Sequence, residues 1–132
     1  MIVLDTYALL WVLAGSPRLG RRAARLVERA LTTDTLWTSA ITFWEVRLLV
    51  LRGRLTMAMA PEEFRVRVQG FGIVELAISG EIAVDAAGLT ESLGDPADCF
   101  IAATGRRHDA KVMTADARLL ASDVVETIDA RR

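Results

Sequence analysis

The sequence has 132 residues, of which 52% are hydrophobic and 25% are charged, and its formal net charge is −1. This length and composition are typical of one globular domain and exclude a disordered chain. The small net charge argues against a broad basic surface for nucleic acid. We therefore expect a single domain over residues 1–132.

The chain carries one cysteine, Cys99, so it forms no internal disulfide, as is usual in a reducing compartment. The opening residues lack a basic region, and Asp5 interrupts their apolar run. This pattern is unlike a signal peptide or a membrane span. We expect a cytoplasmic protein with no membrane contact.

A short apolar, partly β-branched run at residues 2–4 predicts a buried strand, and an apolar helix follows at residues 7–14. A Gly-Ser-Pro turn ends that helix. Asp5 therefore lies between the carboxyl end of a strand and the start of a helix. Its carboxylate is either a helix N-cap or a functional group.

Residues 18–31 have a clear amphipathic helical pattern. Leucines and alanines occupy one side of this helix, and arginines occupy most of the other: Arg18, Arg21, Arg22, Arg25 and Arg29. The arginines form either a solvated face or a stripe that faces phosphate or a partner.

A second strand is predicted at residues 36–38, and Ser39 is placed to cap a helix over residues 40–51. Glu45 lies in the middle of that helix, and its neighbours at helical spacing are all apolar: Ile41, Leu48 and Leu49. A buried carboxylate without a partner is costly, so Glu45 must find a cation or become neutral. This makes Glu45 a candidate functional residue.

The middle of the chain predicts a helix, a strand and a helix, at residues 61–69, 73–76 and 79–89. A further helix begins after Asp95, an N-cap, with Pro96 at its first position, and ends near residue 107. Asp98 lies in the first turn and shares the apolar face with Ile101 and Ala102. Because the cap needs only one carboxylate, Asp98 is available for another role.

A fourth strand is predicted at residues 111–114 and a last one, at an edge of the sheet, at residues 124–128. Between them, Asp116 precedes a short helix at residues 117–121, where it is an N-cap or a functional group. Strands thus alternate with helices along the chain. The pattern predicts an α/β fold, an α/β/α sandwich with a mainly parallel sheet of four to five strands.

Ligands of such sheets bind at the carboxyl ends of the strands. Asp5 and Asp116 follow strands at that edge, and the helices of Glu45 and Asp98 can bring two more acids to it. Two unit charges about 4 Å apart repel by roughly 4 kcal/mol at an effective dielectric of about 20. A divalent cation offsets this repulsion, and ligation by oxygen alone suits Mg²⁺ or Mn²⁺, which activates water.

Four segments, taken in order, carry a family resemblance: Leu4-Asp5-Thr6 with residues 8–11, Ser39-Ala40-Ile41 with residues 44–46, residues 94–98 with residues 101–104, and Thr114-Ala115-Asp116 with Leu119. In this order and spacing, which spans nearly the whole chain, the sequence resembles the PIN-domain ribonucleases. It is most similar to the VapC-like toxins of bacterial or archaeal toxin–antitoxin pairs.

The resemblance implies a metal-dependent endoribonuclease that hydrolyses RNA phosphodiester bonds and acts as a toxin. It implies that Asp5, Asp98 and Asp116 hold Mg²⁺ or Mn²⁺ and that Glu45 orients or deprotonates the attacking water, with Thr6 and Thr114 close by. It also implies a homodimer and an antitoxin that inserts into the active-site groove. The apolar content of the chain is consistent with a homodimer interface.

Two positions depart from the family pattern. Cys99 stands where members usually carry Arg directly after the acid, and Tyr7 stands where they often carry His. The alternative function is therefore a catalytically weak or inactive PIN-like module that only binds a partner.

Two other folds with acids at a parallel sheet fit less well. A signalling receiver domain requires a lysine near its last strand, whereas the only lysine, Lys111, begins a strand. A phosphatase of the haloacid dehalogenase type requires a second Asp two residues after Asp5, where this chain has Tyr7.

Overall fold

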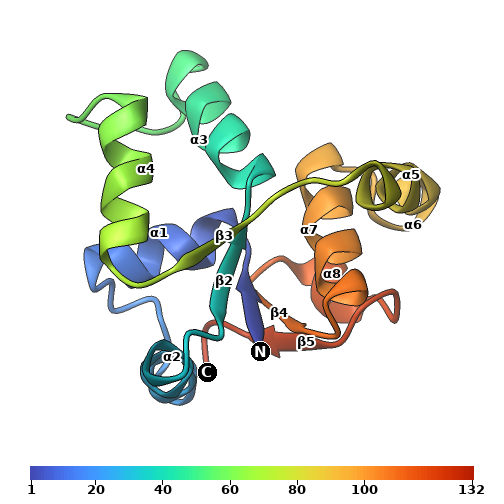
Figure 1. Ribbon diagram of the computed structural model, residues 1–132, viewed down its shortest axis with the longest axis horizontal. Helices are drawn as coiled ribbons and strands as arrows, with labels where there is room; N and C mark the ends of the chain where they lie inside the picture. The colour runs from blue at the N-terminus through green and yellow to red at the C-terminus, as the bar shows by residue number, and fades with distance from the viewer.

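A five-stranded sheet forms the centre of the computed structural model, which describes all 132 residues (Figure 1). Its strand order is β3-β2-β1-β4-β5, and every neighbouring pair is parallel. The strands are β1 (Ile2–Leu4), β2 (Leu36–Ser39), β3 (Val74–Leu76), β4 (Lys111–Thr114) and β5 (Thr127–Asp129). The predicted α/β fold is confirmed, and β5 lies at an edge as predicted, although it begins three residues later than expected.

Eight helices cover the two faces of the sheet: α1 (Thr6–Ala14), α2 (Arg21–Thr32), α3 (Ile41–Leu51), α4 (Pro61–Gly70), α5 (Gly80–Gly88), α6 (Thr90–Leu93), α7 (Pro96–Arg107) and α8 (Ala117–Ala121). The short helix α6 was predicted only as a connection. None of the eight combines the length and the continuous apolar sequence that crossing a bilayer requires.

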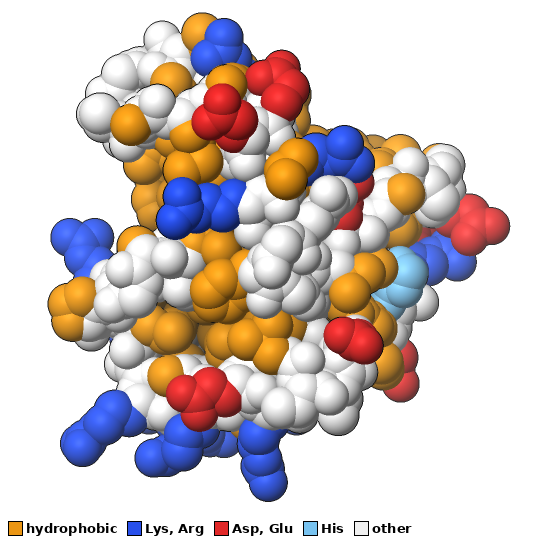
Figure 2. All heavy atoms as spheres, turned by 60° about the vertical axis from the view of Figure 1, so that its left-hand side comes forward, with side chains coloured by type: hydrophobic (Ala, Val, Ile, Leu, Met, Phe, Trp, Pro, Cys, Tyr) orange, Lys and Arg blue, Asp and Glu red, His pale blue; other side chains and the backbone are white.

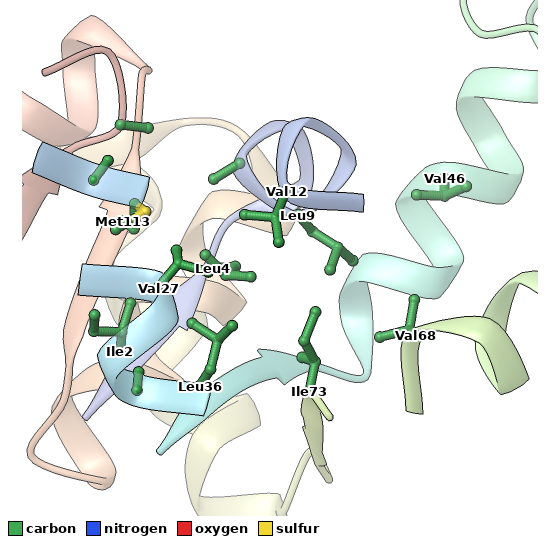
Figure 3. Packing of buried hydrophobic residues seen from close by; sticks show 14 of the residues in the cluster. Ile2, Leu4, Leu9, Val12, Val27, Leu36, Val46, Val68, Ile73 and Met113 are labelled. Carbon is green, nitrogen blue, oxygen red and sulfur yellow. The ribbon is translucent and has the colours of Figure 1, made fainter. Parts of the chain in front are cut away.

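The core has two parts, one on each face of the sheet, and β1 is therefore buried on both sides. Ile2 and Leu4 pack with α1 and α2 on one face, as Figure 3 shows, whereas Val3 packs on the other face with α5 and α7. A strand buried on both faces is typical of parallel sheets and explains the unbroken apolar run. This packing fixes the carboxyl end of β1, where Asp5 follows.

Helix α2 begins three residues later than predicted because the end of the described chain docks there. The Arg132 carbonyl accepts hydrogen bonds from the backbone N–H groups of Arg22 and Ala23, at 2.8 and 3.2 Å. Gly20 precedes the helix, and a Cβ atom there would lie 2.2 Å from the Arg132 backbone. The close approach therefore requires glycine, and Arg18 lies outside the helix in which it was predicted.

Candidate active site

A cleft of about 460 Å³ lies at the carboxyl edge of the sheet. All four predicted acids line this acid cleft, together with side chains from α1 and the end of the chain: Asp5, Thr6, Tyr7, Trp11, Glu45, Asp95, Asp98, Ala115, Asp116 and Arg131. The structure thus brings together four acids from separate parts of the chain, as expected for residues at the carboxyl edge of a parallel sheet.

Asp5 and Asp116 are helix caps and also lie in the cleft. Asp5 Oδ1 accepts a hydrogen bond from the Ala8 N–H at 2.8 Å, and its Oδ2 accepts one from the Thr114 hydroxyl. Asp116 Oδ1 accepts from the N–H groups of Arg118 and Leu119, at 3.0 and 2.9 Å. Capping and a functional role are therefore compatible at both positions, because each cap uses one carboxylate oxygen.

Thr114 connects these two acids. Its hydroxyl donates to Asp5 and accepts a hydrogen bond from the Asp116 N–H at 3.0 Å. Thr114 ends β4 and is fully buried, so its side chain has little freedom to turn. It therefore fixes the Asp5 carboxylate relative to the loop that carries Asp116.

Asp98 and Glu45 reach the cleft from helices α7 and α3. Asp95 caps α7, since its Oδ1 accepts from the Asp98 N–H at 3.1 Å, and this leaves the Asp98 carboxylate free to face the cleft. Glu45 lies on α3, and its half-buried side chain lines the cleft. Neither carboxylate forms an ion pair.

Crowding of acids in a partly buried site perturbs their protonation. Burial, followed by the charges of Asp95, Asp116, Asp5 and Glu45, raises the pKa of Asp98 to about 8. Burial also raises the pKa of Asp5 to about 6, although hydrogen bonds from Thr114 and Ala8 oppose the shift. The pKa of Glu45 is raised mainly by burial. The charged form of each carboxylate is therefore disfavoured, and no cationic side chain pairs with any of the three.

The oxygen donors in the cleft match the preference of Mg²⁺ or Mn²⁺, and a divalent cation would favour the charged form of these carboxylates, whose pKa values are raised first by burial and then by neighbouring acids. No three carboxylate, imidazole or thiol side chains are arranged closely enough to hold an ion as they stand. The donor chemistry fits a metal, and the carboxylates would have to move inward to surround it.

The sequence analysis missed Arg131, the one basic side chain that lines the cleft. Its Nε and Nη2 groups donate to the two carboxylate oxygens of Asp129, at 3.1 and 3.2 Å, and these bonds hold it just beyond β5. The signal was available: Arg131 follows the fifth strand at the same edge as Asp5 and Asp116. Tyr7 and Trp11 also line the cleft from α1 and were not predicted to do so.

Cys99, His108 and the arginines of α2 lie outside the cleft. Cys99 lies on α7, is 3% exposed and packs in the hydrophobic core. Burial there raises the pKa of its thiol. His108 stacks edge-on against Trp37. The α2 arginines do not line the cleft. Figure 2 shows basic side chains along the lower edge of the molecule, below an apolar area.

A second pocket, of about 460 Å³, lies apart from the acids. It is lined mostly by hydrophobic side chains of α3, α4 and their connection.

Comparison with known proteins gives consistent matches. The PIN domain family model matches residues 2–124. Ribonuclease VapC22 of Mycobacterium tuberculosis is 30% identical over 119 residues, which cover 89% of this chain and 88% of that protein.

Solved structures show the same fold. The FitAcB structure from Neisseria gonorrhoeae is 25% identical, covers 98% of both chains and has a TM-score of 0.65. VapBC2 from Rickettsia felis, bound to a DNA fragment from its promoter, is 14% identical, covers 97% of this chain and 98% of that one, and has a TM-score of 0.69.

A test of the Thr114 link follows from its geometry. Thr114→Val keeps the shape of the side chain but removes the hydroxyl that orients Asp5. We expect apparent Mn²⁺ affinity to fall by about 10- to 100-fold, as is usual when a group that orients a metal ligand is removed. Titration of the thermal melting temperature with Mn²⁺ measures the change. Unaltered Mn²⁺ affinity would show that Thr114 has no part in the site.

Proposed function

The chain belongs to the PIN domain family, and on this premise we propose that it is a VapC-like toxin, an endoribonuclease that hydrolyses RNA phosphodiester bonds with Mg²⁺ or Mn²⁺. The observation that carries the proposal is the convergence of Asp5, Glu45, Asp98 and Asp116 on one cleft. The name of the curated relative and the toxin–antitoxin complexes among the similar structures support it.

Asp5, Asp98 and Asp116 would hold the metal ion, which supplies positive charge for the phosphate and lowers the pKa of bound water. Asp5 and Asp116 are already oriented by helix caps and by Thr114. Asp98 completes the set from the first turn of α7. These three residues thus bind and orient rather than transfer protons.

Glu45 orients the attacking water and accepts its proton. Its position on a packed helix fixes the carboxylate, and burial makes it a better base by raising its pKa. Arg131, which remains hydrogen-bonded to Asp129 at the rim of the cleft, offers a guanidinium to the phosphate. Arg131 thus supplies a positive charge to the cleft. Members of the family usually carry an arginine directly after the acid, where this chain has Cys99.

The direct test is cleavage of RNA by the purified protein. We expect single-stranded RNA to be cut with Mg²⁺ or Mn²⁺ and to stay intact with excess EDTA, because the carboxylates need the ion to bind phosphate. Gel analysis of a labelled RNA measures the rate, and re-addition of Mn²⁺ is the control. Cleavage that persists in EDTA would contradict the metal mechanism. No cleavage under any condition would favour the alternative of a partner-binding module.

The proposed partners are a cognate antitoxin and a second copy of the chain, in the cytoplasm. Large apolar side chains remain exposed on the monomer, among them Leu51 at 63%, Val66 at 66% and Val84 at 74%. Surfaces of this kind mark interfaces. We expect a homodimer in solution, and light scattering at micromolar concentration measures its mass. A monomeric mass at moderate salt would contradict this assignment.

A further inference from the structure

A second groove, of about 270 Å³, continues from the acid cleft between α3 and the start of α7. The two share Glu45 and Asp95, so one leads directly into the other. No step in the proposed chemistry uses the far part of this groove. Its side chains indicate what it binds.

Trp44, Leu48 and Arg52 line one side of the groove at a spacing of four residues, which places them in a row along α3. The indole of Trp44 is 49% exposed although it adjoins the buried site. Leu48 lies between the indole and the basic end of the row. The groove therefore presents an aromatic surface near the acids and cations farther away.

The turn after α3 places a second cation, Arg54, at the same end. Gly53 adopts φ = +69°, its N–H donates to the Val50 carbonyl at 3.1 Å, and the Arg54 N–H donates to the Leu49 carbonyl at 2.9 Å. This is the usual glycine-dependent end of a helix. It turns the chain back so that Arg54 lines the groove beside Arg52.

Both arginines are exposed, and neither belongs to any of the six ion pairs in the structure. Their guanidinium groups are therefore free to bind an external anion. An exposed aromatic side chain with unpaired cations is the combination that binds single-stranded nucleic acid, because bases stack and phosphates pair.

We propose that this groove binds a nucleotide of single-stranded RNA adjacent to the bond that is cut, with its base stacked on Trp44 and its phosphate held by Arg52 and Arg54. The assignment rests on the proposed ribonuclease function. A strand leaving the acid cleft past Glu45 and Asp95 enters this groove directly, since both residues line the two hollows. The subsite selects unpaired RNA because a base must leave its helix to stack.

Binding of a fluorescein-labelled, mixed-sequence single-stranded RNA to the Asp98→Asn protein tests the subsite with cleavage suppressed. Adding Trp44→Ala is expected to weaken the affinity by about 5- to 150-fold, whereas Trp44→Phe keeps a stacking surface and most of the affinity. Replacing Arg52 and Arg54 by Ala is expected to reduce the salt dependence, with a slope smaller by about 0.7 for each phosphate that the protein no longer neutralises. Fluorescence anisotropy at several salt concentrations measures both.

Two variants outside the groove serve as controls. Trp37→Phe removes an indole that contacts His108, and Arg67→Ala removes one exposed positive charge on α4. Neither should change RNA affinity. Equal affinity of the Trp44→Ala and parent proteins would overturn the subsite while leaving ribonuclease function intact.

Light scattering separates the remaining outcomes. If Trp44→Ala converts a dimer to a monomer, the groove is a contact between protein copies and the RNA assignment is wrong. If the wild-type protein neither binds nor cuts RNA, the proposed function fails and the subsite fails with it.

Discussion

Asp98→Asn is expected to reduce metal-dependent RNA cleavage by about 10²- to 10³-fold, the usual cost of removing one group that stabilises developing charge. The same change should keep the fold and leave the metal-free protein as stable as wild type or more so. The asparagine amide has the same shape as the carboxylate but carries no charge, whereas burial and then the charges of the neighbouring acids disfavour the charged form of Asp98. Cleavage rates with Mn²⁺ and thermal melts in EDTA measure the two effects.

The Ser79→Ala variant provides the contrasting case. Ser79 caps α5 by accepting a hydrogen bond from the Ile82 N–H at 3.1 Å, and it does not line the acid cleft. Its loss should cost about 1 kcal/mol and leave cleavage unchanged. If Asp98→Asn behaves like Ser79→Ala, melting lower in EDTA and cutting RNA at the wild-type rate, Asp98 has only a structural role.

The metal-free protein is expected to lose stability as the pH rises from about 5 to about 8. Asp5 and Asp98 have native pKa values of about 6 and about 8, above their ordinary value of 3.8. In this range the native state binds more protons than the unfolded state, so the free energy of unfolding falls with rising pH. For Asp5 the rise in pKa from 3.8 to about 6 corresponds to a loss of roughly 3 kcal/mol in the free energy of unfolding.

The acids whose pKa values are lowered do not cancel this fall in stability. Arginine partners lower the pKa values of Glu75, Asp85 and Asp129, so those groups affect stability only at pH values below the range considered. Mn²⁺ should reverse the loss, because protons compete with the ion and binding is tighter at high pH. An ion at 100 times its dissociation constant adds about 2.7 kcal/mol.

Thermal melts in EDTA and in Mn²⁺ at pH 5, 6, 7 and 8 measure this pattern. The melting temperature in EDTA should fall across the series, and the difference made by Mn²⁺ should grow. Asp98→Asn should flatten the upper part of the EDTA curve, because the pKa of Asp98, about 8, is higher than that of Asp5, about 6. A wild-type melting temperature that does not vary with pH in EDTA would show that the acids do not repel one another.

Local patterns in the sequence were sufficient to predict most of the fold. The run Ile2–Leu4 and the capped start at Asp95 and Pro96 depend on neighbouring residues, and the structure confirms both elements. The convergence of the four acids followed from a general property of parallel sheets, because the carboxyl ends of their strands share one edge.

What could not be predicted depends on contacts between distant parts of the chain. The start of α2 is set by the Arg132 carbonyl, about 110 residues away in sequence, so no pattern near Arg18 could locate it. The hydrophobic pattern around Glu45 showed that the residue was unusual, but only the packing of α3 beside α7 showed which groups it meets.

The central position of β1 affects when the enzyme can first act during its own synthesis. Asp5 is made before the other acids of the cleft, and its hydroxyl partner, Thr114, comes 109 residues later, on the strand that pairs with β1. At 5–20 residues per second, a ribosome takes roughly 5 to 20 s to cover that interval. Asp98 comes only shortly before Thr114 in the chain and Asp116 comes directly after it, so for most of this interval the cleft lacks two of its four acids and a nascent chain cannot cut the RNA around it. The order of the strands thus delays activity until translation of the domain is nearly finished.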